Sequence, residues 1–317
     1  MSGSVSSTPS VGFWRIAEEM PDALAVVDPD HARTPYGELY AQVNQLSHGL
    51  RALGLQRGDH VAVTLPNCVE HLALCLAAIQ SGLYITSINW HLVGPEIAYI
   101  LGDAESKVFV SHERFADEAR RAADEAGLPE PHRFAIGRVP GFRPLQELTA
   151  GQPTRRPAKP ETGFIMFYTS GTTGRPKGVR RELPECSPDD SAAAMLGLFA
   201  QFGTRPHEGN VHVTVAPLYH GAPNNWALTS LHSGHPVVLM DRFSAEGLLE
   251  LIERYRVTHS QIRRGASARP QWQVVQAQAT RSLLGRARRP GRLVRRRPLR
   301  RAAESRHTYS ELEKRAR

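Results

Sequence analysis

The stretch Tyr168–Val179 reads Tyr-Thr-Ser-Gly-Thr-Thr-Gly-Arg-Pro-Lys-Gly-Val and follows a strand predicted at 163–168. It combines four Ser or Thr hydroxyls, three glycines and one lysine within twelve positions. Glycines let backbone amides approach an anion closely, hydroxyls add hydrogen-bond donors, and Lys177 adds a positive charge. The composition therefore predicts a loop that binds phosphate.

The order of residues in this loop differs from that of two common nucleotide-binding loops. A Walker loop has Gly-Lys followed directly by Ser or Thr, whereas here Pro176 precedes Lys177 and Gly178 follows it. The GxGxxG pattern of dinucleotide-binding folds is also absent. Kinase-type and Rossmann-type sites are therefore disfavoured, while an ordinary Gly- and Ser-rich surface turn stays open on loop chemistry alone.

Helices and strands alternate on both sides of the loop. Over residues 36–54, apolar side chains recur at spacings of three and four, which predicts an amphipathic helix that stops at Gly54. The same reasoning predicts strands at 60–65, 83–88, 107–111, 163–168, 211–216, 236–240 and 257–261, and helices at 69–81, 95–101, 113–126, 191–202 and after Ser244. Alternation of this kind predicts an α/β fold with mainly parallel sheets covered by helices.

Positive charge is concentrated at one end of the chain. The 317 residues carry a formal net charge of +8, but residues 262–317 hold 16 Arg and one Lys against three Glu, a net of +14. Residues 1–261 are therefore mildly acidic, at −6. Apolar periodicity also stops at Gln261. We expect a partial domain at 1–261 and an Arg-rich, disordered tail at 262–317.

Composition also bears on partners and location. No run of about 18 apolar residues and no secretory leader pattern is present, so we expect a soluble chain without a membrane span. The three cysteines form no CxxC pair, which indicates neither a metal site nor a disulfide framework and favours the reducing cytoplasm. Basic tails can bind nucleic acid, but that partner is not expected for the acidic main body. The oligomeric state is left open.

The loop resembles the signature phosphate-binding loop of the adenylate-forming (AMP-binding) superfamily, which includes acyl-CoA synthetases, luciferases and peptide-synthetase adenylation domains. Parts of residues 36–96, including Leu65-Pro66-Asn67, are similar to the opening segments of that family. The run Pro217-Leu218-Tyr219-His220 resembles the segment that borders the acyl pocket in acyl-CoA synthetases. The resemblance covers residues 12–261 and implies an incomplete large N-terminal domain of the acyl-CoA synthetase type. Within it, the stretch Leu231–Gln261 most resembles bacterial fatty-acid:CoA ligases.

The resemblance implies a two-step reaction. A carboxylate attacks the α-phosphate of Mg-ATP to give acyl-AMP and pyrophosphate, and the coenzyme A thiol then displaces AMP. The implied cofactors are ATP, Mg2+ and coenzyme A, and the implied substrate is a carboxylic acid of the fatty-acid class. The residues expected at the ATP phosphates are Thr169, Ser170, Gly171, Thr172, Thr173, Gly174 and Lys177. Tyr219 and His220 are expected in the substrate pocket, and no catalytic residue or metal ligand is assigned.

Several of the family's motifs have no counterpart after Gln261, namely those for adenine, ribose and Mg2+ and the small C-terminal domain. The first interpretation is therefore a fatty-acid:CoA ligase by descent that is truncated near residue 262 with its phosphate loop intact. A shift of reading frame at that point, and activity of the chain on its own, are left open. The alternative is a non-catalytic nucleotide-binding module, or a pseudogene product, whose basic tail binds an acidic partner. A third interpretation is a poorly folding remnant with an exposed sheet edge.

Overall fold

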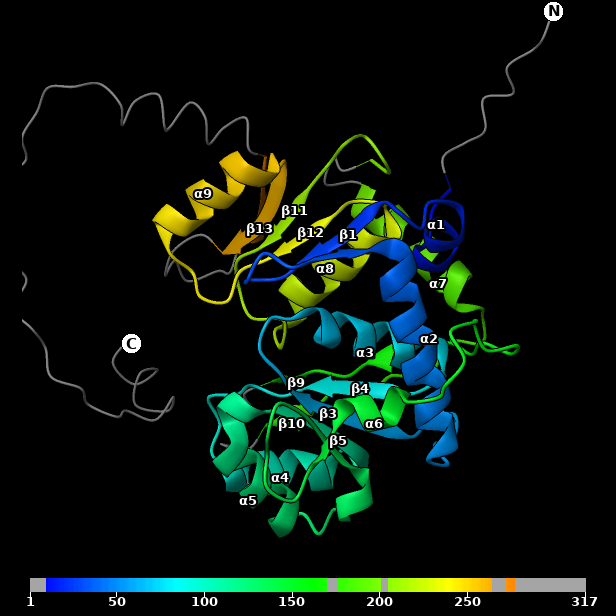
Figure 1. Ribbon diagram of the computed structural model, residues 1–317, viewed down its shortest axis with the longest axis vertical. Coiled ribbons are helices and arrows are strands. Elements are labelled where there is room, and N and C mark those ends of the chain that lie inside the picture. The colour runs from blue at the N-terminus through cyan, green and yellow to red at the C-terminus, as the bar shows by residue number, and fades with distance from the viewer. Residues whose placement is uncertain (1–9, 170–175, 201–204, 264–271, 277–317) are drawn as a thin grey trace, which may run out of the picture. The chain divides into compact units, whose positions relative to one another are not determined.

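The computed structural model describes residues 10–169, 176–200, 205–263 and 272–276 of the chain. Within these residues the strands form two six-stranded sheets, which we call sheet A and sheet B, and a two-stranded hairpin. Helices pack between and outside the sheets (Figure 1). The alternation of strand and helix that the sequence predicts is therefore the observed architecture, and the predicted α/β class is confirmed.

Sheet B is parallel throughout, in the order β7-β6-β5-β3-β4-β8. Its strands are β3 (His60–Thr64), β4 (Tyr84–Ser87), β5 (Ser106–His112), β6 (Arg133–Ile136), β7 (Arg143–Pro144) and β8 (Phe164–Ile165). In β3, Val61 and Val63 point to one hydrophobic cluster and Ala62 to another. Both faces of the sheet are therefore buried, which explains the unbroken apolar runs in its central strands.

Sheet A has the order β14-β13-β11-β12-β1-β2, with parallel central strands and an antiparallel pair at each edge. Its strands are β1 (Leu24–Val27), β2 (Arg33–Pro35), β11 (His212–Thr214), β12 (Val237–Leu239), β13 (His259–Arg263) and β14 (Trp272–Gln276). Val213 and Val238 face the outer helix, whereas Val237 and Leu239 face the centre of the molecule.

Nine α-helices occur in the described residues: α1 (Phe13–Glu19), α2 (Tyr36–Ala52), α3 (Val69–Gln80), α4 (Gly94–Asp103), α5 (Ala116–Glu125), α6 (Leu145–Thr149), α7 (Pro188–Ala200), α8 (Gly221–His232) and α9 (Ala245–Tyr255). The largest hydrophobic cluster joins α2, α3 and α8 to the inner faces of both sheets. A second cluster packs α4 and α5 on the outside of sheet B, and a third packs α9 on the outside of sheet A (Figure 1). Helices thus alternate with sheets in five layers.

The structure also contains elements that the sequence did not predict. These are α1, β1, β2, β6, β7, α6, β10, α8 and β14 among the α-helices and strands of the described residues. The strand predicted at 163–168 is divided, because Phe164–Ile165 pairs with β4 while Tyr168 turns away into the hairpin. Ser244 caps α9 as predicted, since its hydroxyl accepts a hydrogen bond from the Gly247 N–H at 3.0 Å.

The division expected at Gln261 stays a prediction, because residues 264–271 and 277–317 lie outside the described part of the chain. The backbone of β13 continues to Arg263, and β14 pairs with it in antiparallel register. Sheet A therefore extends beyond the point at which apolar periodicity stops.

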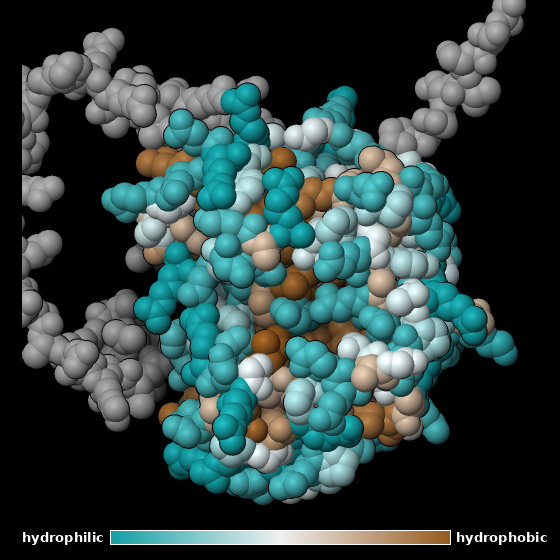
Figure 2. All heavy atoms as spheres, viewed as in Figure 1, coloured by the Kyte–Doolittle hydropathy of each residue, from teal (hydrophilic) through white to brown (hydrophobic). Residues whose placement is uncertain are grey.

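Hydrophilic residues cover most of the face that Figure 2 shows, with hydrophobic residues between them in the middle. The large apolar side chains with the greatest exposure in the described residues are Met20, Val93, Val179 and Phe243. Of these, Val179 directly follows the hairpin that carries the candidate phosphate loop. Among the helices that the structure describes, none has both the length and the apolar character needed to cross a membrane.

Candidate functional site

The candidate phosphate loop is carried by a hairpin. Strand β9 (Tyr168–Thr169) pairs with β10 (Lys177–Gly178) in antiparallel register, so the loop leaves and returns at neighbouring backbone positions. Lys177 lies at the return and is exposed. Of the residues predicted to contact phosphate, Ser170, Gly171, Thr172, Thr173 and Gly174 lie outside the described residues.

Gly178 is closely packed against two side chains of the hairpin segment. A Cβ atom there would lie 2.0 Å from Met166 Cε and 2.9 Å from Tyr168 Cζ. Tyr168 is itself fixed, because its hydroxyl donates a hydrogen bond of 2.6 Å to the Asp103 carboxylate at the end of α4. Burial, and then this carboxylate, raises the pKa of Tyr168 far above its ordinary value. The base of the hairpin is therefore held against the layer of α4.

Tyr219 and His220 lie in an aromatic group with side chains from the segments that follow β4 and β5. The Tyr219 ring meets the Trp90 ring edge to face at 4.5 Å between centroids, and Trp90 stacks on Phe115 at 5.7 Å. His220 is the N-cap residue of α8, and its ring centroid is 4.4 Å from that of Tyr219. The structure thus brings these two predicted pocket residues to the loops that follow β4 and β5.

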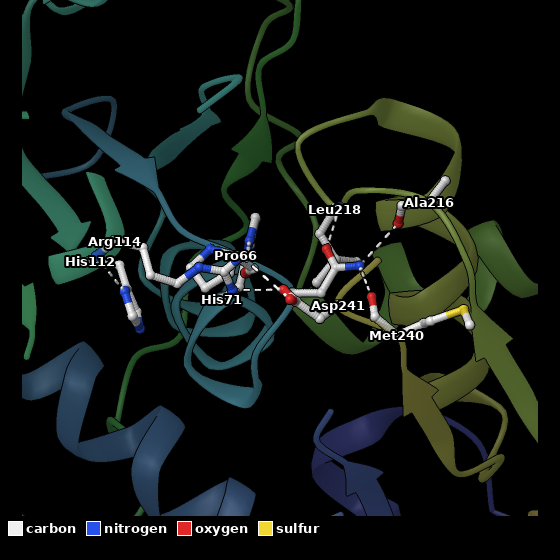
Figure 3. A network of polar contacts seen from close by, with 9 residues as sticks. Pro66, His71, His112, Arg114, Ala216, Leu218, Met240 and Asp241 are labelled. Carbon is white, nitrogen blue, oxygen red and sulfur yellow. Dashed lines mark hydrogen bonds and ion pairs between the residues drawn. The ribbon is translucent and has the colours of Figure 1, made fainter. Parts of the chain in front are cut away.

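Asn67 connects the two sheets through their backbone. Its Nδ2 donates to the carbonyl oxygens of Met240 at 2.8 Å and Ala216 at 3.2 Å, and its Oδ1 accepts from the Leu218 N–H at 2.8 Å (Figure 3). Asn67 follows β3 of sheet B, whereas its partners follow β11 and β12 of sheet A. All of the polar atoms of this side chain are therefore used to hold two strand ends together.

A second link between the sheets is an ion pair. Arg114, after β5, donates to the two carboxylate oxygens of Asp241, after β12, at 2.7 and 3.3 Å (Figure 3). Both side chains are partly exposed, so the pair adds little stability on its own. Together with Asn67 it shows that the carboxyl ends of the parallel strands in both sheets meet in one region. In open α/β sheets this is the usual place for a ligand site.

A cavity of about 350 Å³ runs along α8, beside the hairpin. Its lining residues are Ile79, Phe164, Ile165, Phe167, Val179, Arg181, Pro188, Ser191, Ala192, Met195, Asn225, Leu228 and His232. Phe167 and Val179 come immediately before and after the hairpin. Gly221 approaches the Phe167 ring so closely that a Cβ atom would lie 3.3 Å from it. The cavity therefore begins where the hairpin and the N-terminus of α8 meet.

Tyr219 and His220 are not among the residues that line this cavity, although His220 directly precedes α8. Their assignment to the substrate pocket stays a prediction. The polar lining residues Asn225 and His232 were not predicted, because α8 itself was not. A helix with two asparagines, Pro223 and buried residues on nearly all sides has no apolar stripe to reveal it.

Histidine, cysteine and acidic side chains do not assemble into a group of three or more that could hold a metal ion, as far as the described residues extend. Cys68 and Cys75 have raised pKa values because both thiols are buried.

The hairpin, the two sheets and the helices between them form an α/β domain with a candidate ligand site where the carboxyl ends of its parallel strands meet. Residues 13–262 match the AMP-binding enzyme family, and the chain belongs to that family. This match also confirms the family resemblance that the sequence indicates around the loop.

Two curated relatives illustrate the range of the family. The chain is 30% identical over 241 residues to the long-chain-fatty-acid–CoA ligase FadD13 of Mycobacterium tuberculosis, a match that covers 75% of this chain and 46% of that protein. It is 27% identical over 233 residues to the crotonobetaine/carnitine–CoA ligase of Salmonella choleraesuis, covering 70% of this chain and 44% of that protein. The chain thus spans about half the length of these ligases.

Among solved structures, the inhibitor-bound N-terminal domain of FACL13 from Mycobacterium tuberculosis superimposes with a TM-score of 0.67 at 27% identity. The match covers 79% of this chain and 62% of that one. The fold is therefore that of an acyl-CoA synthetase N-terminal domain, as the sequence predicts.

Proposed function

We propose that this chain binds the phosphates of ATP at the hairpin loop and a carboxylic acid in the adjoining cavity, as in the first step of an acid:CoA ligase. The observation that carries the proposal is the position of Phe167 and Val179. These residues flank the phosphate-loop hairpin and also line the cavity along α8. A carboxylate in the cavity would therefore lie beside the phosphates that it attacks.

The ATP part of the proposal rests on the loop composition and on the base of the hairpin. The predicted phosphate contacts are Thr169, Ser170, Gly171, Thr172, Thr173, Gly174 and Lys177. Phosphoryl oxygens carry most of the negative charge in the reaction, so positioned donors and a lysine lower its barrier electrostatically. Mg2+ is proposed to arrive bound to the ATP phosphates, because Mg2+ commonly takes several of its ligands from them.

The proposal that the cavity binds a carboxylic acid rests on its volume and its lining residues. Its volume falls within the range of about 300–1,000 Å³ that is typical of small-molecule pockets. Apolar side chains predominate, among them Phe164, Met195 and Leu228. An acid with an apolar chain fits such walls, and the fatty-acid class is proposed because one curated relative is a long-chain-fatty-acid–CoA ligase. Coenzyme A is proposed as the acyl acceptor from the relatives alone, and no residue is assigned to it.

The test is release of pyrophosphate by the full chain with ATP, Mg2+ and a panel of carboxylic acids. We expect release that requires an acid and falls about 10- to 100-fold in Lys177→Ala, since a charge-assisted contact to phosphate is lost. Lys159→Ala is the matched control, because Lys159 is exposed and is not among the residues that line the cavity. Release that is equal in wild type and Lys177→Ala would contradict the assignment of the loop.

The alternative is a nucleotide-binding module without catalysis, which the concentration of 16 Arg in residues 262–317 favours because such a tail suits an acidic partner. Binding of ATP without acid-dependent release of pyrophosphate, by protein with native circular dichroism, would support this alternative. Acid-dependent release would exclude it.

A further inference from the structure

Arg181 is the one charged side chain among the described residues that line the cavity along α8. His232, the other ionisable residue of the lining, is neutral near pH 7, because burial lowers its pKa to about 4. The remaining lining side chains are apolar or carry neutral polar groups. A single positive charge in a mainly apolar cavity favours a ligand that has a negative group at that position.

Arg181 lies at the end of the cavity that is opposite the phosphate loop. After β10 the chain runs back antiparallel to β9, and the Val179 N–H donates to the Phe167 carbonyl oxygen at 3.2 Å. The chain then reaches Phe164, whose ring centroid is 5.8 Å from the guanidinium carbon of Arg181. Phe164 precedes Thr169 by five residues, so at about 3.3 Å per residue these two positions are up to about 16 Å apart.

The guanidinium of Arg181 is available to a ligand. Within the described part of the chain it makes neither an ion pair nor a hydrogen bond. The Arg181 backbone is held in place, because its carbonyl oxygen accepts a hydrogen bond from the Tyr84 hydroxyl at the start of β4. The adjacent Arg180 is engaged elsewhere, since its guanidinium lies over the Tyr84 ring at 4.8 Å and donates to the Gly58 carbonyl at 3.3 Å.

We propose that the acid taken by this cavity is a dicarboxylic acid whose second carboxylate pairs with Arg181. The inference rests on the proposed function, in which the reacting carboxylate lies beside the phosphate loop. A guanidinium offers two parallel N–H donors that match the two oxygens of a carboxylate. Apolar side chains between the two ends of the cavity, among them Ile165 and Leu228, contact the intervening chain of the acid. Arg181 therefore determines substrate specificity.

Dodecanoate and dodecanedioate, which have the same number of carbon atoms, test the inference. Binding of each acid to the full chain is measured by calorimetry at about pH 7.5, where every carboxyl group is ionised in water, with ATP binding measured in parallel. We expect dodecanedioate to bind about threefold to tenfold tighter, as for a charge-assisted pair that is partly exposed. We expect Arg181→Gln to remove this preference while dodecanoate binding is kept, because the second carboxylate then enters an apolar site unpaired.

Arg180→Gln is the matched control, because Arg180 is also exposed but is not among the residues that line the cavity, and it should keep the preference. Arg181→Glu should reverse the preference, so that dodecanoate binds tighter than dodecanedioate. The Tyr84 bond uses the backbone carbonyl of Arg181, so both substitutions at this exposed position leave it in place.

The inference and the proposed function fail in different ways. Equal or weaker binding of dodecanedioate by wild type, with dodecanoate bound, would overturn the inference and leave the proposed function intact. A preference that survives in Arg181→Gln, or that falls equally in Arg180→Gln, would overturn the inference as well. Binding of ATP but of neither acid would contradict the proposed acid site together with the inference.

Discussion

Asn67 Nδ2 donates a 2.8 Å hydrogen bond to the carbonyl oxygen of Met240, which is 173 residues away in the sequence. The bond joins the loop after β3 of sheet B to the loop after β12 of sheet A. Asn67 is only 3% exposed and its partners Leu218 and Met240 are also buried, so water has little access to these two backbone groups in place of the amide. The junction at which the candidate site forms therefore depends on one buried side chain.

We expect Asn67→Ala to lower the free energy of unfolding by roughly 3 kcal/mol, because several backbone groups would be left buried and unpaired. Urea unfolding followed by circular dichroism measures this loss. Asn210→Ala is the control, since Asn210 donates a single bond of 3.2 Å to the Arg205 carbonyl, and we expect a loss below about 1 kcal/mol. Similar losses in the two variants would show that the junction is not specially dependent on Asn67.

Substitution by alanine should have opposite effects on stability at two helical glycines. In α2, a Cβ atom on Gly49 would lie 2.0 Å from the Leu148 carbonyl oxygen, so Gly49→Ala must separate α2 from α6. We expect a loss of about 1–3 kcal/mol, as for other overpacked sites. In α4, Gly102 has open space around its Cα, and Gly102→Ala should add up to about 1 kcal/mol through helix propensity. Thermal unfolding of the two variants measures whether each substitution lowers or raises stability. A stabilising Gly49→Ala would refute the close packing of α2 on α6.

Asp28 gives the stability a distinctive pH dependence. Its carboxylate accepts a 2.9 Å hydrogen bond from the Val69 N–H at the start of α3. Burial, and then the nearby Glu70 carboxylate, raises the pKa of Asp28 to about 7. Between about pH 4 and pH 7 the folded chain keeps a proton that the unfolded chain releases, so this group's contribution to stability falls as the pH rises.

Asp28→Asn removes the titration and keeps an oxygen acceptor for Val69. We therefore expect the stability of the variant relative to wild type to increase from pH 4.5 to pH 7 and to level off above that range. Urea unfolding at four pH values measures the difference, in which contributions from the buried histidines cancel. Asp22→Asn, at an exposed position, is the matched control variant. A flat difference for Asp28→Asn would contradict the raised pKa.

The sequence predicted the helices and strands in which buried side chains recur at regular spacing along the chain. The strand β3 reads His-Val-Ala-Val-Thr and is buried on both faces, and α2 has a clear apolar stripe. In β6, by contrast, Arg133 is buried through contacts with Asp124 and the Leu128 carbonyl, so a charged residue occupies a strand position. Such burial depends on a tertiary partner and has no periodic pattern.

The candidate site likewise has one part that could be predicted from the sequence and one part that could not. The phosphate loop is a continuous stretch, so its chemistry could be predicted from composition alone. The cavity along α8 could not, since it is formed by segments distant in the chain, and the Phe13–His232 contact spans 219 residues. Helix α8 is buried on nearly all sides and therefore lacks the periodicity that reveals a half-exposed helix.

The central claim is that the hairpin loop binds the phosphates of ATP. The most direct measurement is the affinity of the full chain for Mg-ATP by calorimetry, in wild type, Lys177→Ala and Lys159→Ala. We predict binding in wild type and Lys159→Ala, and affinity about 10- to 100-fold weaker in Lys177→Ala, as expected when a charge-assisted phosphate contact is lost. Equal affinity in all three proteins, or no binding by folded wild type, would contradict the account.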